Sequence, residues 1–314
     1  MKKMNLKRIL GIVFAVALLS SCASTSKSTA AKLTKTESRA FWRIDGTDKN
    51  GNPSTVYIQG TFHLGDEQIL PLADEVQNAF VNADRLVGEI STQGYAELAS
   101  RSAELNAPNK DGKKITDSLT DTEKAFLIQV FGENLPLVDP LDPWQVTTAL
   151  TASLYASSGL SAEYGLDNSF IASAAQLGRT WEGLDEVQTQ IDVITYGDYD
   201  FQIKTLKEMI RTILDPKDGA ELLSLTTGLY KAYVKDDMKE MEKLFNKSNE
   251  NDVEDDPRNK EMLDLVYKNR NKDWAKDITN YLNEGGTTFI FAGTAHWLGD
   301  VSVFKFLRDM KTIN

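Results

Sequence analysis

The sequence predicts an α/β protein with a central mixed β-sheet, helices packed around it and a helical insertion in the middle of the chain. Two observations support this prediction. A short motif, Gly60–Asp66, follows an apolar run rich in β-forming residues and returns as Gly293–Asp300 after a second such run. Between the two copies, apolar residues recur mostly at helical spacing.

The two motifs contain the only histidines of the chain, His63 and His296, each three residues after a glycine. Each histidine is expected just past the carboxyl end of a strand, where open α/β sheets bind their ligands. The strands come from opposite ends of the chain, so the histidines share a site only if both strands lie in one sheet. No shift in composition divides the chain, and we expect residues 38–314 to form a single domain.

The overall composition favours a globular protein that does not bind nucleic acid. The chain has 314 residues, of which 41% are hydrophobic, and its formal net charge is −11. This apolar content is enough to build a core. A nucleic-acid partner is disfavoured, because a basic surface supplies most of the affinity in such complexes.

The amino-terminal segment resembles the signal peptide of a bacterial lipoprotein. Basic residues precede an apolar run, Ile9–Leu19, that is shorter than a usual membrane span. Leu19-Ser20-Ser21-Cys22 resembles a lipobox, and Cys22 is the only cysteine. We expect residues 1–21 to be removed, Cys22 to be acylated and residues 22–37 to form a flexible tether. The protein is therefore expected in the cell envelope, lipid-anchored to the outer membrane or to the outer leaflet of the cytoplasmic membrane.

The first motif is expected to follow a hairpin. Phe41–Ile44 and Thr55–Ile58 flank a turn rich in Gly, Asn and Asp, and the second strand leads to His63. A helix and then a buried strand over 85–90 complete a strand, helix, strand unit. Glu89, at the end of that strand, arrives at the same sheet edge as His63, although a solvated glutamate is the simpler interpretation.

The middle of the chain is predicted to be mostly helical. Asp142-Pro143 supplies an N-cap and an N1 proline, and Asp167 is expected to cap a helix over Phe170–Leu177. Further helices are expected over 120–130, 142–159, 191–210, 222–244, 259–282 and 301–310, with one short strand over 179–184.

Two imidazoles with nearby carboxylates suit a divalent metal ion that keeps open positions for water and substrate. Metal-bound water is a nucleophile near neutral pH, and a carboxylate can act as its general base. In the alternative without a metal, one histidine is the general base and the other stabilises an oxyanion. A serine triad is disfavoured, because the chain lacks Gly-x-Ser-x-Gly. The candidate carboxylates are Glu89, Asp66, Asp300 and Glu182.

With these motifs the chain resembles the TraB/GumN (PrgY) family, which includes the Tiki proteins. The resemblance rests on the two GxxH motifs, Gly60–His63 and Gly293–His296, and extends in the expected order over nearly all of the mature chain. The other matching segments are Leu70-Pro71-Leu72, Glu89, Asp142-Pro143-Trp144, Gly165-Leu166-Asp167, Trp181-Glu182-Gly183-Leu184 and Arg270-Asn271. The family is similar in fold to the erythromycin-esterase and ChaN group, which implies a central sheet surrounded by helices.

The Tiki members imply a metal-dependent protease of the envelope, and therefore a peptide or protein substrate. Carried over to this chain, the resemblance makes His63 and His296 metal ligands and makes Glu89 a ligand or a base. It also implies manganese or cobalt as the favoured ion, with zinc possible. The remaining catalytic residues that it implies are Arg270, which would stabilise developing negative charge, Asn271 and Glu182.

Other relatives imply binding without catalysis. The alternative function is therefore a lipoprotein that sequesters a peptide signal, haem or another small ligand in the same pocket. Arg270 also has a simpler interpretation, as an ion pair on a helix surface. The bulky Trp297 after the second histidine departs from the family pattern, and it either narrows access to the site or packs in the core.

Overall fold

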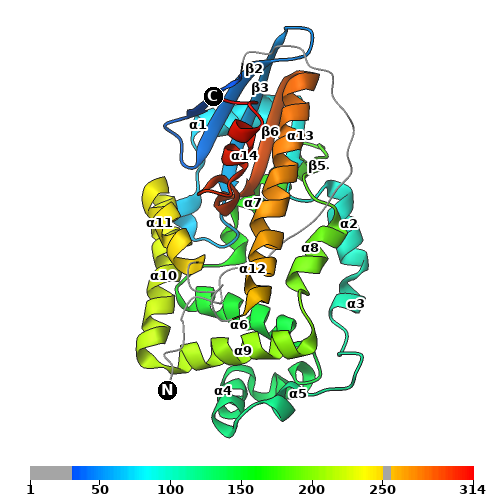
Figure 1. Ribbon diagram of the computed structural model, residues 1–314, viewed down its shortest axis with the longest axis vertical. Helices are drawn as coiled ribbons and strands as arrows, with labels where there is room; N and C mark the ends of the chain where they lie inside the picture. Colours follow the sequence, from blue (N-terminus) through cyan, green and yellow to red (C-terminus); the bar gives the residue numbers. More distant parts are fainter. Residues whose placement is uncertain (1–29, 250–255) are drawn as a thin grey trace.

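The computed structural model describes residues 30–249 and 256–314 of the chain, and Figure 1 shows them as a sheet with helices around and below it. The described sheet has six strands in the order β1-β2-β3-β6-β4-β5. This arrangement confirms the predicted α/β class with a central mixed sheet. The strands are β1 (Lys32–Lys35), β2 (Phe41–Thr47), β3 (Pro53–Thr61), β4 (Arg85–Gly88), β5 (Glu182–Gly183) and β6 (Gly286–Gly293).

The two motif-bearing strands are neighbours in this sheet. β3 and β6 pair in parallel, from Ser54 opposite Gly286 to Thr61 opposite Gly293. Because parallel neighbours end at the same edge, the loops after both strands emerge side by side. β6 is also flanked by β4, and its residues from Thr288 onward are buried, as expected for a parallel strand that is covered on both faces. The prediction that both motifs belong to one sheet is confirmed.

The amino-terminal side of the sheet is antiparallel. β2 and β3 form the predicted hairpin, with Ile44 opposite Val56. The expected flexible tether over 22–37 is wrong for its last part, because Lys32–Lys35 forms the edge strand β1 against β2. The side chain of Leu33 packs on the core, and backbone pairing with β2 also holds β1 in place. The earlier part of the tether, the signal peptide and Cys22 lie outside the described residues.

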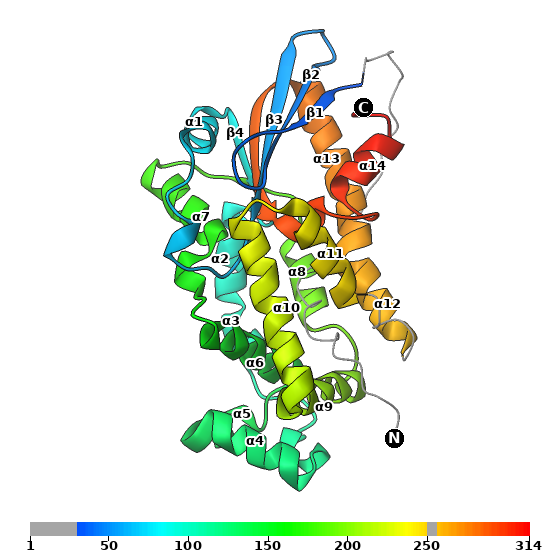
Figure 2. The same cartoon turned by 90° about the vertical axis from the view of Figure 1, so that its left-hand side faces the viewer.

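Helices cover both faces of the sheet. α1 and α7 lie on one face, and α13 and α14 lie on the other (Figures 1 and 2). The helices of the described residues are α1 (Asp74–Asn82), α2 (Thr92–Ser100), α3 (Ser102–Leu105), α4 (Asp121–Phe131), α5 (Leu135–Val138), α6 (Pro143–Ser157), α7 (Leu166–Gln176), α8 (Val187–Ile194), α9 (Tyr199–Leu214), α10 (Pro216–Val234), α11 (Met238–Asn249), α12 (Pro257–Leu263), α13 (Arg270–Glu284) and α14 (Val303–Asp309).

The predicted helical insertion is also confirmed. α4, α6, α9 and α10 gather away from the sheet and enclose a second hydrophobic cluster that includes Leu127, Leu150, Leu206 and Leu222 (Figure 2). A capping box at Thr120 begins α4, and the predicted Asp142-Pro143 helix start is present. β5 lies between α7 and α8, so the chain returns briefly to the sheet before α9 and α10.

The late helix is longer than predicted and irregular at one point. α12 and α13 are joined by a π-helical segment, Asp264–Asn269, which ends just before Arg270. Such π-helical turns are rare and often occur at functional sites.

Candidate functional site

Three predicted site residues meet at the carboxyl edge of the parallel strands. His63 follows β3, Glu89 follows β4, and His296 lies in the 3-10 turn Thr294–Trp297 after β6. A Cβ atom added to Gly293 would lie 3.2 Å from Glu89 Oε1, 3.6 Å from His63 Nε2 and 3.7 Å from His296 Cδ2. The three side chains therefore surround one point, and the predicted meeting of the two motifs is confirmed.

The glycines of the two motifs serve different purposes. Gly293 has φ −51° and ψ 131°, which other residues also adopt, so its lack of a side chain matters for the space between the site residues. Gly60 instead lies in a packed position, where a Cβ would come 2.8 Å from Thr294 Oγ1 and 3.2 Å from the Trp42 ring. The second motif keeps the site open, and the first keeps the sheet tightly packed.

His63 is the accessible histidine, with 55% of its side chain exposed. Its Nδ1 lies 2.8 Å from Asp167 Oδ2, and Thr61 Oγ1 donates to the other oxygen of the same carboxylate. The Asp167 charge raises the pKa of His63 to about 9, although partial burial opposes this. With Nδ1 donating to Asp167, Nε2 is the ring nitrogen left to face Glu89 across Gly293.

Asp167 is a site residue that the sequence analysis assigned to a different role. It was expected to cap a helix beginning near Phe170, but α7 begins earlier, at Leu166, after Gly165. The helix starts there because Leu166 N donates to Phe62 O, and Gly165 leaves room for the His63 carbonyl. Asp167 therefore lies in the first turn, and its side chain reaches His63.

His296 is the buried histidine, with 4% of the residue exposed. Its Nδ1 lies 2.6 Å from Asn271 Oδ1, and its Nε2 lies 3.0 Å from Arg270 Nη1. Because the guanidinium can only donate, Nε2 accepts and Nδ1 carries the proton. Burial, assisted by the Arg270 charge, lowers the pKa of His296 well below its usual value. His296 is thus a neutral acceptor.

Arg270 is buried beside the two histidine motifs, so the interpretation as a surface ion pair is wrong. One per cent of the residue is exposed, and its Nη2 lies 2.7 Å from Glu89 Oε2 and 2.6 Å from Asp185 Oδ2. The other Glu89 oxygen accepts from Gly293 N at 2.8 Å. Removal of one partner of such a buried ion pair destabilises the protein, because the other charge is left without compensation.

Asp185 is the second residue that the sequence analysis missed. Its backbone N donates to Glu89 O at 2.8 Å, and Trp274 Nε1 donates to its Oδ1 at 2.8 Å. Burial raises the pKa of Asp185, while the Arg270 charge opposes the rise. Its signal was its position just after the short strand that contains Glu182.

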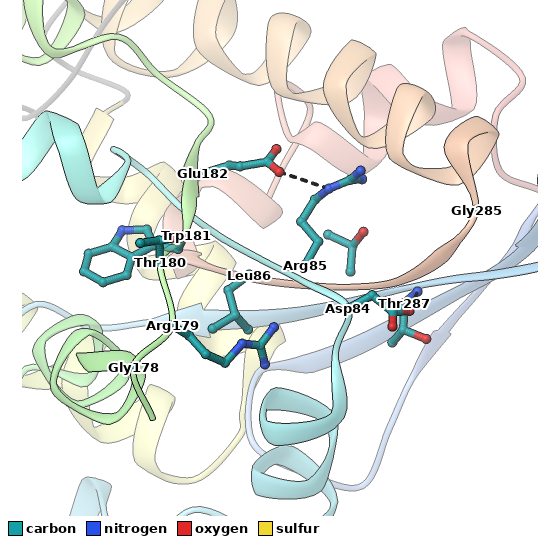
Figure 3. Close-up of a pocket in the computed structure, with 11 residues that line it drawn as sticks. Asp84, Arg85, Leu86, Gly178, Arg179, Thr180, Trp181, Glu182, Gly285 and Thr287 are labelled. Carbon is teal, nitrogen blue, oxygen red and sulfur yellow. Dashed lines mark hydrogen bonds and ion pairs between the residues drawn. The ribbon is translucent and has the colours of Figure 1, made fainter. Parts of the chain in front are cut away.

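Glu182 is not brought into this cluster. Glu182 is opposite Val87, two residues before Glu89. Its side chain is 56% exposed, and its Oε1 lies 3.2 Å from Arg85 Nε. The pair borders a cavity of about 570 Å³ at the amino-terminal ends of β4 and β6, the opposite edge of the sheet (Figure 3). Glu182 is therefore removed from the candidate site, because its side chain pairs with Arg85 beside this cavity.

The other proposed carboxylates are also elsewhere. Asp66 accepts from the Tyr230 hydroxyl at 2.6 Å and caps a 3-10 turn, and Asp300 is exposed. Trp297 is buried and packs on Phe304 with ring centroids 5.3 Å apart. Of the two interpretations of Trp297, core packing fits these contacts.

The donors at this site fit a three-ligand metal ion poorly as they are arranged. His63 Nε2 and Glu89 Oε1 face one point, but the lone pair of His296 Nε2 is taken by Arg270. Among residues 30–249 and 256–314, no group of three or more His, Cys, Asp or Glu is placed to hold an ion. The expected manganese, cobalt or zinc ion stays a prediction.

The fold and site define an α/β protein whose polar centre is built by paired strand-end motifs. The TraB/PrgY/gumN family model matches residues 40–312, and the chain belongs to this family. A Treponema pallidum (strain Nichols) protein described as uncharacterized is 24% identical over 313 residues, covering 96% of this chain and 90% of its own. No solved structure matches the chain. The expected relation to the Tiki and ChaN-like proteins stays a prediction.

The two histidines should titrate far apart. Because Asp167 raises the pKa of His63 and burial lowers that of His296, we expect His63 to titrate near pH 9 and His296 to titrate well below its usual pKa. Ring ¹⁵N spectra can follow both, since the chain has only two histidines. Asp167→Asn should move the His63 midpoint down toward 6.5 and leave His296 unchanged. Two overlapping titrations near 6.5 would contradict this description.

Proposed function

We propose that this protein is a hydrolase that cleaves a carbonyl-containing bond, most simply a peptide bond, with His63 as its general base. The observation that supports the proposal most directly is the setting of His63. Asp167 holds Nδ1, and Nε2 and Glu89 Oε1 both lie close to the position that a side chain at Gly293 would occupy. An imidazole oriented by a carboxylate and left accessible at its second nitrogen is the arrangement that general bases use.

In this mechanism His63 Nε2 removes a proton from a water molecule that attacks the carbonyl carbon. Asp167 stabilises the imidazolium that forms, and the same proton then passes to the leaving group. Glu89 borders the reacting space and is fixed by Gly293 N and Arg270, so it can orient the water through its remaining lone pairs. His296 takes no part in proton transfer, because it is buried and its nitrogens are already hydrogen-bonded.

Arg270 and Asn271 act through other residues in this proposal. Both are buried, and their side chains contact His296, Glu89 and Asp185. We therefore assign them as positioning residues. The earlier expectation that Arg270 stabilises developing charge on the substrate does not fit these contacts.

The substrate is proposed to be a peptide or protein of the cell envelope. This location rests on the basic, apolar and Leu-Ser-Ser-Cys order of residues 1–22. Within residues 30–249 and 256–314, none of the helices is long and apolar enough to cross a bilayer. The proposed anchor is a lipid on Cys22, which ends the Leu-Ser-Ser-Cys sequence.

Peptide-cleavage profiling of the purified chain tests the activity. His63→Ala should lower kcat/KM by at least about 100-fold, the usual contribution of a general base. Gly293→Ala should also abolish turnover with little change in melting temperature, because its Cβ would fill the space between His63 and Glu89. Glu89→Gln should reduce activity, and Glu182→Gln is its matched control at the far edge, expected to stay near wild type. Ligand binding without any turnover would contradict the proposal and favour the sequestering lipoprotein.

The pH profile gives a further check on His63. A general base must be neutral to accept a proton, so kcat/KM should rise with pH and level off above about 9, the pKa of His63. Asp167→Asn removes the charge that raises this pKa, so its profile should level off at lower pH and at a lower plateau. A profile that falls between pH 6 and 9 would contradict the assignment.

The lipid anchor has its own test. Cells expressing the chain should incorporate labelled palmitate into it, and Cys22→Ala should abolish the label, because position 22 is the only thiol. Label that survives in the variant would contradict the lipoprotein prediction.

A further inference from the structure

The centre of the site holds a fully engaged guanidinium group. Arg270 Nε and Nη2 donate to Asp185 Oδ2 at 3.0 and 2.6 Å, and Nη2 also donates to Glu89 Oε2 at 2.7 Å. Its Nη1 donates to Val266 O at 3.2 Å, within the π-helical segment, and to His296 Nε2 at 3.0 Å. The guanidinium also lies over the Trp274 ring, 4.8 Å from its centroid.

His296 is complementary to this guanidinium. Its Nδ1 is held by Asn271 Oδ1, whose amide nitrogen donates to Val301 O at 2.7 Å. This fixes which nitrogen carries the proton and directs the lone pair of Nε2 at Arg270. The ring is also packed against Trp274 and Tyr267, with centroids 4.3 and 5.4 Å away. The ring has no free nitrogen to offer an ion unless Arg270 moves.

We propose that Arg270 is the resident cation of this site and closes it to divalent metal ions. The ion and the guanidinium would compete for Glu89 and for the lone pair of His296 Nε2. The inference concerns the site of the proposed hydrolase but does not depend on turnover, since it is a statement about binding.

With Arg270 in place, a divalent ion would find too few protein donors and an unfavourable positive charge. With Arg270 in place, an ion at the point beside Gly293 meets only His63 Nε2 and Glu89, and it also faces the positive charge of the guanidinium. Two protein donors are fewer than metal sites of this class use. Removal of the guanidinium would free His296 Nε2 and leave Glu89 and Asp185 without their cationic partner. Together with His63, those groups would supply two histidines and two carboxylates to an ion.

Cobalt binding by the full chain tests the proposal. Wild type, Arg270→Met and Arg85→Met are titrated with Co²⁺, which is followed by its visible absorption and by melting temperature. Arg270→Met should gain one bound Co²⁺ and melt roughly 5 °C higher in saturating cobalt. The gain should vanish in Arg270→Met with His296→Ala. Arg85→Met is the matched control, because Arg85 also pairs with two carboxylates, Glu182 and Glu284, but lies away from the histidines.

Arg270→Met leaves buried carboxylates unpaired, so Arg270→Met with Asp185→Asn is made alongside it as a variant with less uncompensated charge. The single variant His296→Ala, which keeps Arg270, should bind cobalt no differently from wild type. One equivalent of Co²⁺ bound by wild type and lost on His296→Ala would overturn the proposal. The proposal would also be overturned if Arg270→Met, or Arg270→Met with Asp185→Asn, folds and gains no ion. If both Arg270 variants fail to fold, the wild-type and His296→Ala comparison decides. A failure of the hydrolase proposal appears separately, as absence of turnover.

Discussion

The parallel pairing of β3 with β6 is the constraint on which the rest of the site depends. It joins strands that are more than 200 residues apart in the chain and places Thr61 opposite Gly293. Thr294 Oγ1 then donates to Thr61 O, so the two motif loops are tied to each other as well as to the sheet. α10 of the helical insertion also contacts the first motif, because the Tyr233 hydroxyl donates to Gly60 O at 2.9 Å and Phe62 packs against the Tyr233 ring.

The two motifs share a sequence pattern, but their histidines have opposite environments. His63 follows a loop that is open to solvent and meets the carboxylate at the start of α7, which favours its charged form. His296 sits under α13, where burial and Arg270 favour the neutral form. When local environments shift the pKa values of two titratable groups in opposite directions, one group commonly acts as the acid or base and the other has a supporting role. The two motifs therefore share a structural position, while the proposed proton transfer is assigned to His63 alone.

The sequence was sufficient to predict the fold class, the shared sheet and the meeting of His63, Glu89 and His296, because strand ends and short motifs are local signals. It did not reveal Asp167 or Asp185, whose roles depend on where α7 begins and on the backbone bond from Asp185 to Glu89. It favoured Glu182 through the family resemblance, but its position opposite Val87 and its pairing with Arg85 depend on tertiary structure. It also allowed Arg270 to be a surface residue, since the burial of a helix face depends on tertiary packing.

Carbethoxylation of the native chain tests the central claim, that matched motifs produce one accessible and one buried histidine. Diethyl pyrocarbonate modifies neutral, accessible imidazoles, and peptide mass spectrometry resolves the two sites because the chain has only His63 and His296. At pH 9, where His63 is about half neutral, His63 should be modified while His296 reacts only after unfolding. Modification of both histidines at similar rates in the folded protein, or of His296 first, would contradict the claim.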